Sequence, residues 1–402
     1  GSRSDPARMA SNFAGVGGAD DSRNDIVIRG NSPLGVVYRV EGIDIPNPSH
    51  FSISGSTGGP VSILNNKIMA NSDFFMSAFP AEYGNSTSGV FDLKLRNGNN
   101  ERHELTGQFG FLGTELMAEG PMSKSGNSSY IVMGRYSTLS MFQALGIKIG
   151  TDAVPIYGDG AFKFNWRLKN GGSLSLFGIG GASKIEILIS DQKEYSEDLY
   201  GESDRDQYFN TSMYVGGLSY KKALNEKTFV ATSFAFSQER QHSKHDFLIR
   251  SVDAENQITI DDMYRLQEYT FTTSKGTAYF SLKHKVNKRH LIQAGINADI
   301  YYYNMVDSAL APGHNSANHS DFNVRWDYQG AAALIQPFIQ WKWRMTEKMD
   351  FTLGLHNQYF SLSNSISVAE PRLGWRLNLN KGQAISLGAG MHSQTQPQYT
   401  YL

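Results

Sequence analysis

The residues best suited to covalent chemistry stand in incomplete motifs. His103 and Glu104 begin the sequence HELTG, which starts like the helix of a zinc protease but lacks the second histidine and falls in an expected strand. Ser219 and Lys222 have the S-x-x-K spacing of some acyl enzymes, yet they lie where an expected strand runs into a turn. The sequence GSTGG at 55–59 lacks the following helix that a phosphate-binding loop needs. We therefore expect no enzyme activity and no catalytic residue.

The sequence also gives little support for a metal-binding site. The chain contains no cysteine, which excludes disulfides and thiolate metal sites. His242 and His245 are three residues apart on an expected strand, so their side chains point to opposite faces. The stretch 191–210 is rich in carboxylates, which are ligands for calcium, but it has no EF-hand spacing, and a solvated outer loop is the competing interpretation. We expect no metal site and no cofactor.

Composition narrows the possible partners. The 402 residues include 37 Lys and Arg against 38 Asp and Glu, a formal net charge of -1. This balance gives no bulk attraction to nucleic acid. No apolar run reaches the about 20 residues that a membrane-spanning helix needs, and the first residues contain no signal segment. We expect the chain to be incomplete at both ends.

Strict alternation of apolar and polar residues begins near Glu101. In FKFNWRL at 162–168, the aromatic rings of Phe162, Phe164 and Trp166 point one way, and Lys163 and Asn165 point the other way. The same division recurs at LIQAGINADI (291–300) and PRLGWRLNLN (371–380). Each strand therefore has one apolar face and one polar face.

Short and long connections alternate between these strands, of which we count about thirteen. In an antiparallel up-and-down sheet, this alternation puts all short turns at one rim and all long loops at the other. Several strands exceed the about 9–11 residues that cross a bilayer. The pattern predicts a transmembrane β-barrel, with a soluble β-sandwich as the alternative.

Three stretches carry a resemblance to a known family. NDIVIRGNSPLGVVYRVEGIDIPNPSHF (24–51), FPAEYGNSTSGVFDLKLRNGN (79–99) and EGPMSK (119–124) resemble the plug-to-barrel region of TonB-dependent outer-membrane receptors, most closely the Bacteroidetes type. The resemblance implies plug strands at the first two stretches and the end of the second barrel strand at the third. It is specific over roughly the first 140 residues and depends on pattern and turn spacing beyond them.

The resemblance implies a mainly β fold: an antiparallel up-and-down barrel preceded by a small α/β plug. Residues 1–100 are the expected plug domain and residues 101–402 the first part of a barrel of about 22 strands. The implied function is import of a scarce nutrient across the outer membrane of a Gram-negative bacterium by energy-coupled plug rearrangement. An iron chelate, peptide, glycan or cobalamin fits equally well. The alternatives are a TonB-dependent signal-transducing receptor and a soluble secreted β-rich binding protein.

The implied partners are outer-membrane lipid, an inner-membrane TonB protein that acts through a segment upstream of residue 1, and a surface lipoprotein. No nucleic acid is expected. Aromatic and polar residues in two loops are candidate ligand contacts, namely Asn47, His50, Phe51 and Ser54 in the plug and Tyr195, Tyr200 and Tyr208 in the acidic loop. Charged residues embedded among apolar or turn residues are candidate latches between plug and barrel, namely Arg29, Glu41, Glu82 and Arg96.

Overall fold

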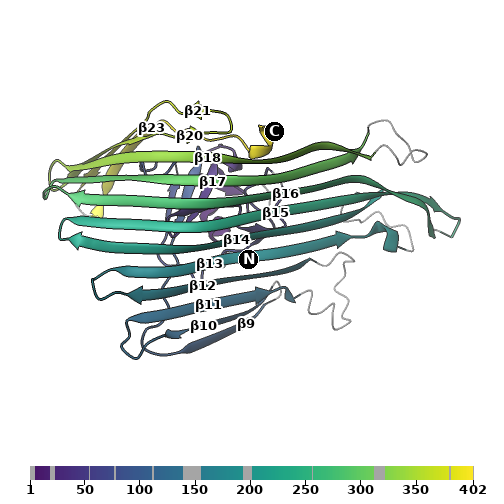
Figure 1. Cartoon of the computed structure of the whole chain (residues 1–402), viewed down its shortest axis with the longest axis horizontal. Helices are drawn as coiled ribbons and strands as arrows, with labels where there is room; N and C mark the ends of the chain where they lie inside the picture. Colours follow the sequence, from purple (N-terminus) through teal and green to yellow (C-terminus); the bar gives the residue numbers. More distant parts are fainter. Residues whose placement is uncertain are drawn as a thin grey trace.

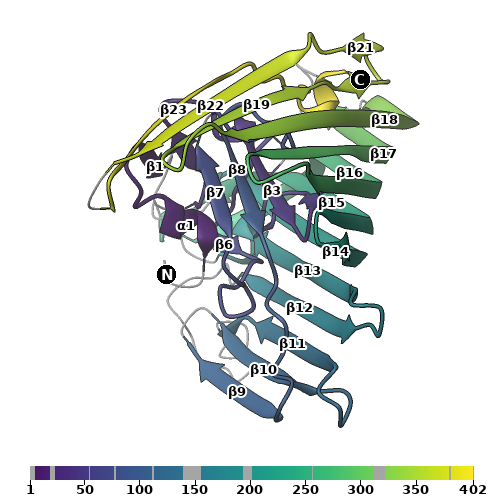
Figure 2. The same ribbon diagram turned by 90° about the vertical axis from the view of Figure 1, so that its left-hand side faces the viewer.

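A computed structural model describes residues 5–18, 23–53, 55–76, 78–110, 113–138, 155–192, 202–255, 257–311, 322–379 and 382–401. A large curved sheet makes up most of the molecule, and the N-terminal segment lies against its inner side (Figures 1 and 2). Among the described residues, no helix is long and apolar enough to cross a membrane.

The large sheet contains fifteen strands within the described ranges. Thirteen of them form one antiparallel path in chain order: β9 (Glu104–Phe109), β10 (Thr114–Pro121), β11 (Ser128–Tyr136), β12 (Ile156–Arg167), β13 (Ser173–Ile187), β14 (Arg205–Asn225), β15 (Thr228–Val252), β16 (Ile258–Lys285), β17 (His290–Leu310), β18 (Phe322–Arg344), β19 (Met349–His356), β22 (Glu370–Asn378) and β23 (Ala384–Gly390). The short strands β20 (Tyr359–Phe360) and β21 (Ser365–Ile366) form a hairpin beside β18. The count along the path agrees with the number expected from the sequence.

Connections at one rim of the sheet are short. The turns β10–β11, β12–β13, β14–β15, β16–β17 and β18–β19 gather at the same end of the strands, as the alternation of loop lengths predicts (Figure 1). From this rim the strands extend unequally, up to 28 residues in β16. Strands β9 and β23 lie at the two ends of the path.

The two faces of the sheet differ as the alternation predicts. On β17, Ile296 and Ile300 of the outer face are 38% and 48% exposed, whereas Asn297 and Asp299 of the inner face are 4% and 1% exposed. On β22, Leu373 is 44% exposed and the adjacent Arg372 only 5%. Polar side chains are therefore buried on the inner side, where they need partners.

The N-terminal segment supplies those partners with small sheets of its own. Its main sheet has the order β4-β3-β8-β7, with β3 and β8 parallel and the other pairs antiparallel. Its strands are β1 (Val16–Gly18), β2 (Ile26–Ile28), β3 (Val36–Val40), β4 (Ile43–Ile45), β5 (Ser49–His50), β6 (Val61–Ser62), β7 (Asp73–Met76) and β8 (Gly89–Leu93). Helix α1 spans Pro6–Ala10 and the 3₁₀ helix η2 spans Pro33–Gly35, while η3 (Ile189–Asp191) and η6 (Gln398–Thr400) lie in the later part of the chain.

The N-terminal segment contains more strand than helix within the described residues. Helix α1 has only five residues, and the stretch 61–76 contains β6, β7 and turns. Two side chains in this stretch bond to nearby backbone: Ser62 Oγ accepts from Leu64 N at 3.1 Å, and Asn65 Oδ1 accepts from Lys67 N at 3.0 Å. Such bonds compete with helix formation. Phe74 in β7 instead stacks on Phe91 of β8, with ring centroids 4.3 Å apart.

Apolar side chains of the N-terminal segment and of the large sheet form one core. Buried Val40, Ile43 and Leu93 belong to the same cluster as Phe177 and Val215 of β13 and β14. Figure 2 shows β3, β7 and β8 on the concave side, with β12 to β18 curving past them. The apolar cluster packs the N-terminal segment against the large sheet. Polar contacts then fix the position of the segment relative to the sheet.

Candidate ligand-binding site

A cavity of about 740 Å³ lies between the N-terminal segment and the inner face of β15, β16 and β17. The N-terminal side contributes turns around Ser32–Tyr38, Asp44–Asn47 and Gly55–Thr57, and residues His392–Gln398 close another side. Pockets of this size hold small ligands. We take this cavity as the candidate ligand site.

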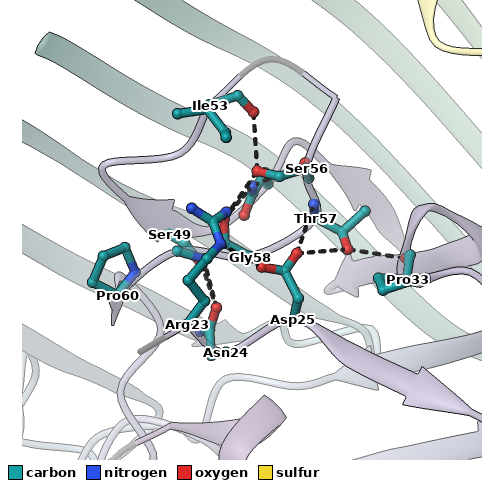
Figure 3. Close-up of polar contacts among 12 residues, drawn as sticks. Arg23, Asn24, Asp25, Pro33, Ser49, Ile53, Ser56, Thr57, Gly58 and Pro60 are labelled. Carbon is teal, nitrogen blue, oxygen red and sulfur yellow. Dashed lines mark hydrogen bonds and ion pairs between the residues drawn. The ribbon is translucent and has the colours of Figure 1, made fainter. Parts of the chain in front are cut away.

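One wall of the cavity is a loop held by side chains from the preceding segment. Asn24 Oδ1 accepts from Gly59 N at 2.7 Å, and Asp25 Oδ1 accepts from Thr57 N at 3.1 Å. Arg23 Nη2 donates to the carbonyl of Gly58 at 2.7 Å (Figure 3). Charge-assisted bonds of this kind are stronger than neutral ones, so the loop presents a fixed surface.

The candidate contacts in this loop have different positions. Asn47 lines the cavity and fastens the loop, since its Nδ2 donates to the carbonyls of Ser56 and Gly58 at 3.2 and 3.1 Å. The backbone amide of Phe51 donates to the Ser183 and Thr211 hydroxyls of the large sheet. Ser54, Tyr195 and Tyr200 lie outside the described residues. Tyr208 lies on β14, with Lys244 Nζ 4.1 Å from the centroid of its ring.

His50 does not line the cavity but is buried against the large sheet. Its Nε2 lies 2.9 Å from Asp159 Oδ2, and Arg135 donates to the same oxygen from its Nε at 2.9 Å. Tyr157 packs on the imidazole, with centroids 4.8 Å apart. Burial lowers the pKa of His50, and the hydrogen bond to Asp159 offsets this only in part. The structure thus assigns His50 a contact between the two regions.

Glu41 sits at the tip of the β3–β4 hairpin, in a turn that points it at the large sheet. Glu41 and Gly42 have φ of 51° and 87°, so both central residues of the two-residue turn are left-handed. That twist suits a tight hairpin, although a left-handed conformation is unusual for glutamate. Only the close fit of the surroundings maintains such a conformation.

Two lysines from different strands converge on the Glu41 carboxylate. Lys163 Nζ of β12 donates to Oε1 at 2.8 Å and Lys221 Nζ of β14 to Oε2 at 3.1 Å, while the amide of Leu95 donates to Oε1 at 3.0 Å. Burial alone raises the pKa of Glu41, but the two lysine charges outweigh it and hold the pKa below its ordinary value. Glu41 is therefore ionised at neutral pH.

Glu82 of the N-terminal segment contacts β16 and β17 of the large sheet. Its carboxylate accepts from Tyr279 Oη and from Gln293 Nε2, each at 2.6 Å. Burial raises its pKa, yet the charge of Arg39 and the Tyr279 hydrogen bond together lower it. The guanidinium of Arg39 also lies over the Tyr279 ring, 4.6 Å from the centroid.

Arg96 forms a two-pronged pair with Glu119 of β10. Its Nη1 and Nη2 donate to the two carboxylate oxygens at 2.7 and 2.6 Å. Arg29 lies in a turn after β2, with φ of 51°, and its amide donates to the carbonyl of Gly15. Glu41, Glu82 and Arg96 thus contact the large sheet, as expected for latches, whereas the backbone contact of Arg29 lies within the N-terminal segment.

Sequence reasoning missed the partners on the large sheet. Arg372 Nη1 donates to the carbonyls of Phe79, Pro80 and Tyr83 at 3.3, 2.9 and 2.6 Å. His356 Nδ1 lies 2.8 Å from the carbonyl of Ala81. The alternation predicts an inward position for Arg372, but the sequence contains no signal of which carbonyl either side chain would meet.

Comparison with solved structures gives consistent matches over nearly the whole chain. The outer membrane transporter YddB from Escherichia coli aligns with a TM-score of 0.67 at 13% identity, over 98% of this chain and 59% of that one. The ferric enterobactin receptor PfeA from Pseudomonas aeruginosa, a mutant, gives 0.61 at 14% identity, over 99% and 60%. The siderophore receptor PirA from Acinetobacter baumannii gives 0.60 at 15% identity, over 99% and 60%.

The fold is shared with outer-membrane receptors. At these identities the likeness concerns the fold, and the chain spans about three fifths of the length of the matched structures. Those proteins are described as transporters or receptors rather than as enzymes. No protein-family model matches the sequence, and a search of curated proteins found no relative.

Proposed function

We propose that this chain contains the plug and part of the barrel wall of a TonB-dependent receptor that imports a scarce nutrient. Residues 1–100 would be the plug and residues 101–402 wall strands of a closed barrel of about 22 strands. The observation that carries the proposal is the pairing of buried charges of the N-terminal segment with lysines on the inner face of the large sheet, seen at Glu41 with the buried Lys163 and the partly exposed Lys221. A wide barrel needs such a filled lumen to keep a membrane sealed.

The outer face supports a location in the outer membrane. Large apolar side chains on twelve strands of the path are more than a third exposed within the described residues, including Leu116, Val132, Leu176, Leu218, Phe234, Phe280, Ile296 and Ile339. An apolar outer face of this kind suits lipid contact. In water, exposed apolar side chains on so many strands would be unusual for a monomeric protein.

The polar contacts between plug and wall suit a domain that must move. A buried ion pair stabilises a contact little more than apolar side chains of similar size would, because the cost of desolvating the two charges opposes their attraction. Water that enters during rearrangement can take over the hydrogen bonds of Glu41, Glu82 and Arg96. We propose these residues, together with Arg29, as latches, and the candidate cavity as the place where ligand binding shifts the plug population. An inner-membrane TonB protein would supply the pull through a segment upstream of residue 1.

Cell fractionation is the first test. We expect the full-length protein in the outer-membrane fraction, extracted only by detergent, because of the apolar outer face. Recovery from the aqueous fraction would instead favour a soluble β-rich binding protein and would overturn the proposal.

A reversible tether tests the plug movement. A Cβ placed on Gly354 of β19 would lie 2.7 Å from Ala81 Cβ, so a cysteine pair at 81 and 354 would form a disulfide after a small shift. The chain has no other cysteine. In A81C/G354C cells, we expect uptake of the compound that the wild-type cells deplete from the medium to stop and to return on reduction. Each single cysteine variant is the control, and uptake through the oxidised pair would contradict plug movement.

A further inference from the structure

The candidate cavity has a lining with a specific chemical character. Hydroxyl and amide side chains dominate it, including Ser56, Thr57, Asn85, Gln241, Thr273 and Gln394. Three aromatic rings, those of Tyr38, Phe271 and Tyr301, also reach it. Such a surface can hydrogen-bond to a polar ligand and stack on flat or aliphatic groups.

Most charged side chains around the cavity already have a partner of opposite charge. Lys275 is the one lysine or arginine in the lining within the described residues. Its Nζ donates to the carbonyl of Asp44 at 2.6 Å and lies 3.6 Å from Asp299 Oδ1. The Asp44 carboxylate lies 3.8 Å from Arg39 Nε. These charges are therefore already engaged within the protein.

Glu239 has a different environment. It lies on β15 opposite Thr273 of β16, one step diagonally from Lys275. A lysine side chain is long enough to reach a diagonal neighbour on the next strand. The Lys275 ammonium instead contacts Asp44 and Asp299. Gln241 Nε2 donates a hydrogen bond to Glu239 Oε1 at 2.9 Å. Among the described residues, no cation lies within ion-pair distance of the Glu239 carboxylate.

His392 is the other titratable group of the lining with open bonding capacity. It packs on Phe79, with centroids 4.1 Å apart. Both of its ring nitrogens are buried without a hydrogen-bond partner among the described residues. A ligand with carbonyl or amide groups would satisfy these nitrogens.

We infer that the cavity binds a short peptide with a positively charged side chain, whose cation pairs with Glu239 while its backbone meets the amide and hydroxyl groups. This inference rests on the proposed import function and names its substrate class. A ferric chelate or phosphate would bring negative charge to a lining whose lysine is already paired and whose Glu239 carboxylate has no cation beside it among the described residues. A neutral oligosaccharide would supply no counter-charge to Glu239.

Binding of defined peptides to the full-length protein purified in detergent tests the inference. The probes are an N-acetylated, C-amidated tripeptide with a central lysine, the same peptide with acetyl-lysine, and the same peptide with glutamate. Maltotriose and a ferric catecholate complete the set. We expect the lysine peptide to bind at least about tenfold more tightly than the other four, since a hydrogen bond to a charged group has roughly that effect.

The variant E239Q keeps the shape of the side chain and removes its charge, so it should abolish the preference for the lysine peptide. E239D should retain a reduced preference. The control E104Q changes a glutamate of β9 that is not in the lining. It should leave binding unchanged, and circular dichroism checks the fold of each variant.

Equal binding of the lysine and acetyl-lysine peptides, tighter binding of maltotriose or the ferric catecholate, or an unchanged preference in E239Q would each overturn the inference. Absence of binding by every probe would do the same. The import function has separate tests. Detergent-dependent extraction and tether-sensitive uptake without a cationic preference would refute only the peptide assignment, whereas recovery from the aqueous fraction would refute both.

Discussion

The inner and outer faces of the large sheet come from the same strands but are stabilised in opposite ways. On β12, Lys163 faces inward and is 6% exposed, while the ring of Phe162 next to it faces outward. The inner face depends on specific partners from the N-terminal segment, because a buried charge is tolerated only when it is paired. The outer face needs no partner beyond an apolar environment. The stability of the inner face therefore depends on which residue stands at each position. The stability of the outer face depends only on whether the residue is hydrophobic.

The largest expected effect follows from breaking an inner contact. Glu41→Gln would leave Lys163 buried without a counter-charge, which should lower the free energy of opening of the β3–β4 hairpin by about 3–5 kcal/mol. Amide hydrogen exchange of the hairpin in the full-length protein measures this.

The double variant Glu41→Gln with Lys163→Met is the control for that experiment. It removes both charges, so most of the stability should return. A double variant as unstable as Glu41→Gln would mean that the strained turn, and not the ion pair, holds the hairpin.

The outer face should respond to charge according to depth. Ile296→Arg on β17 should lower the unfolding free energy in lipid vesicles by about 2–4 kcal/mol, because Ile296 lies near the middle of the part of β17 that would cross the bilayer from the short-turn rim. Val324 is 61% exposed near the far end of β18, so Val324→Arg should cost about 0–1 kcal/mol. Equal effects of both substitutions would argue against a lipid-facing belt.

The His50 contact should be sensitive to pH. Its pKa is lowered in the folded protein, so as pH falls below about 6.5 the unfolded state takes up a proton that the folded state does not. Docking should therefore weaken between pH 6.5 and 5.5, by at most about 1 kcal/mol. Hydrogen exchange of β5 at the two pH values measures this, and His50→Gln should remove the difference. A difference that persists in His50→Gln would assign it to another group.

The smallest effect is expected at the second lysine of the same cluster. The side chain of Lys221 is 41% exposed, far more than the buried side chain of Lys163, so solvent screens its interaction with Glu41. Lys221→Met should change hairpin opening by about 1 kcal/mol or less. A loss comparable to that of Glu41→Gln would show that partly exposed pairs also control docking.

The sequence by itself determined the pattern of the large sheet. Period-2 alternation is a local property of each strand, so it placed Lys163, Asn165 and Arg372 on the inner face and Ile296 on the outer face before any contact was known. Turn residues likewise indicated where the strands end. The course of the stretch 61–76 was not determined locally, because side chains there bond to nearby backbone and Phe74 packs across to Phe91.

Only the tertiary structure decided which inner residues meet. Glu41 and Lys163 are 122 positions apart, and Arg372 lies 289 positions from the Tyr83 carbonyl that it contacts. No local rule encodes such pairs, because they depend on how the N-terminal segment seats against the curved sheet. The same packing directs Lys275 toward Asp44 and Asp299 and leaves Glu239 as the carboxylate that faces the cavity without a cation among the described residues.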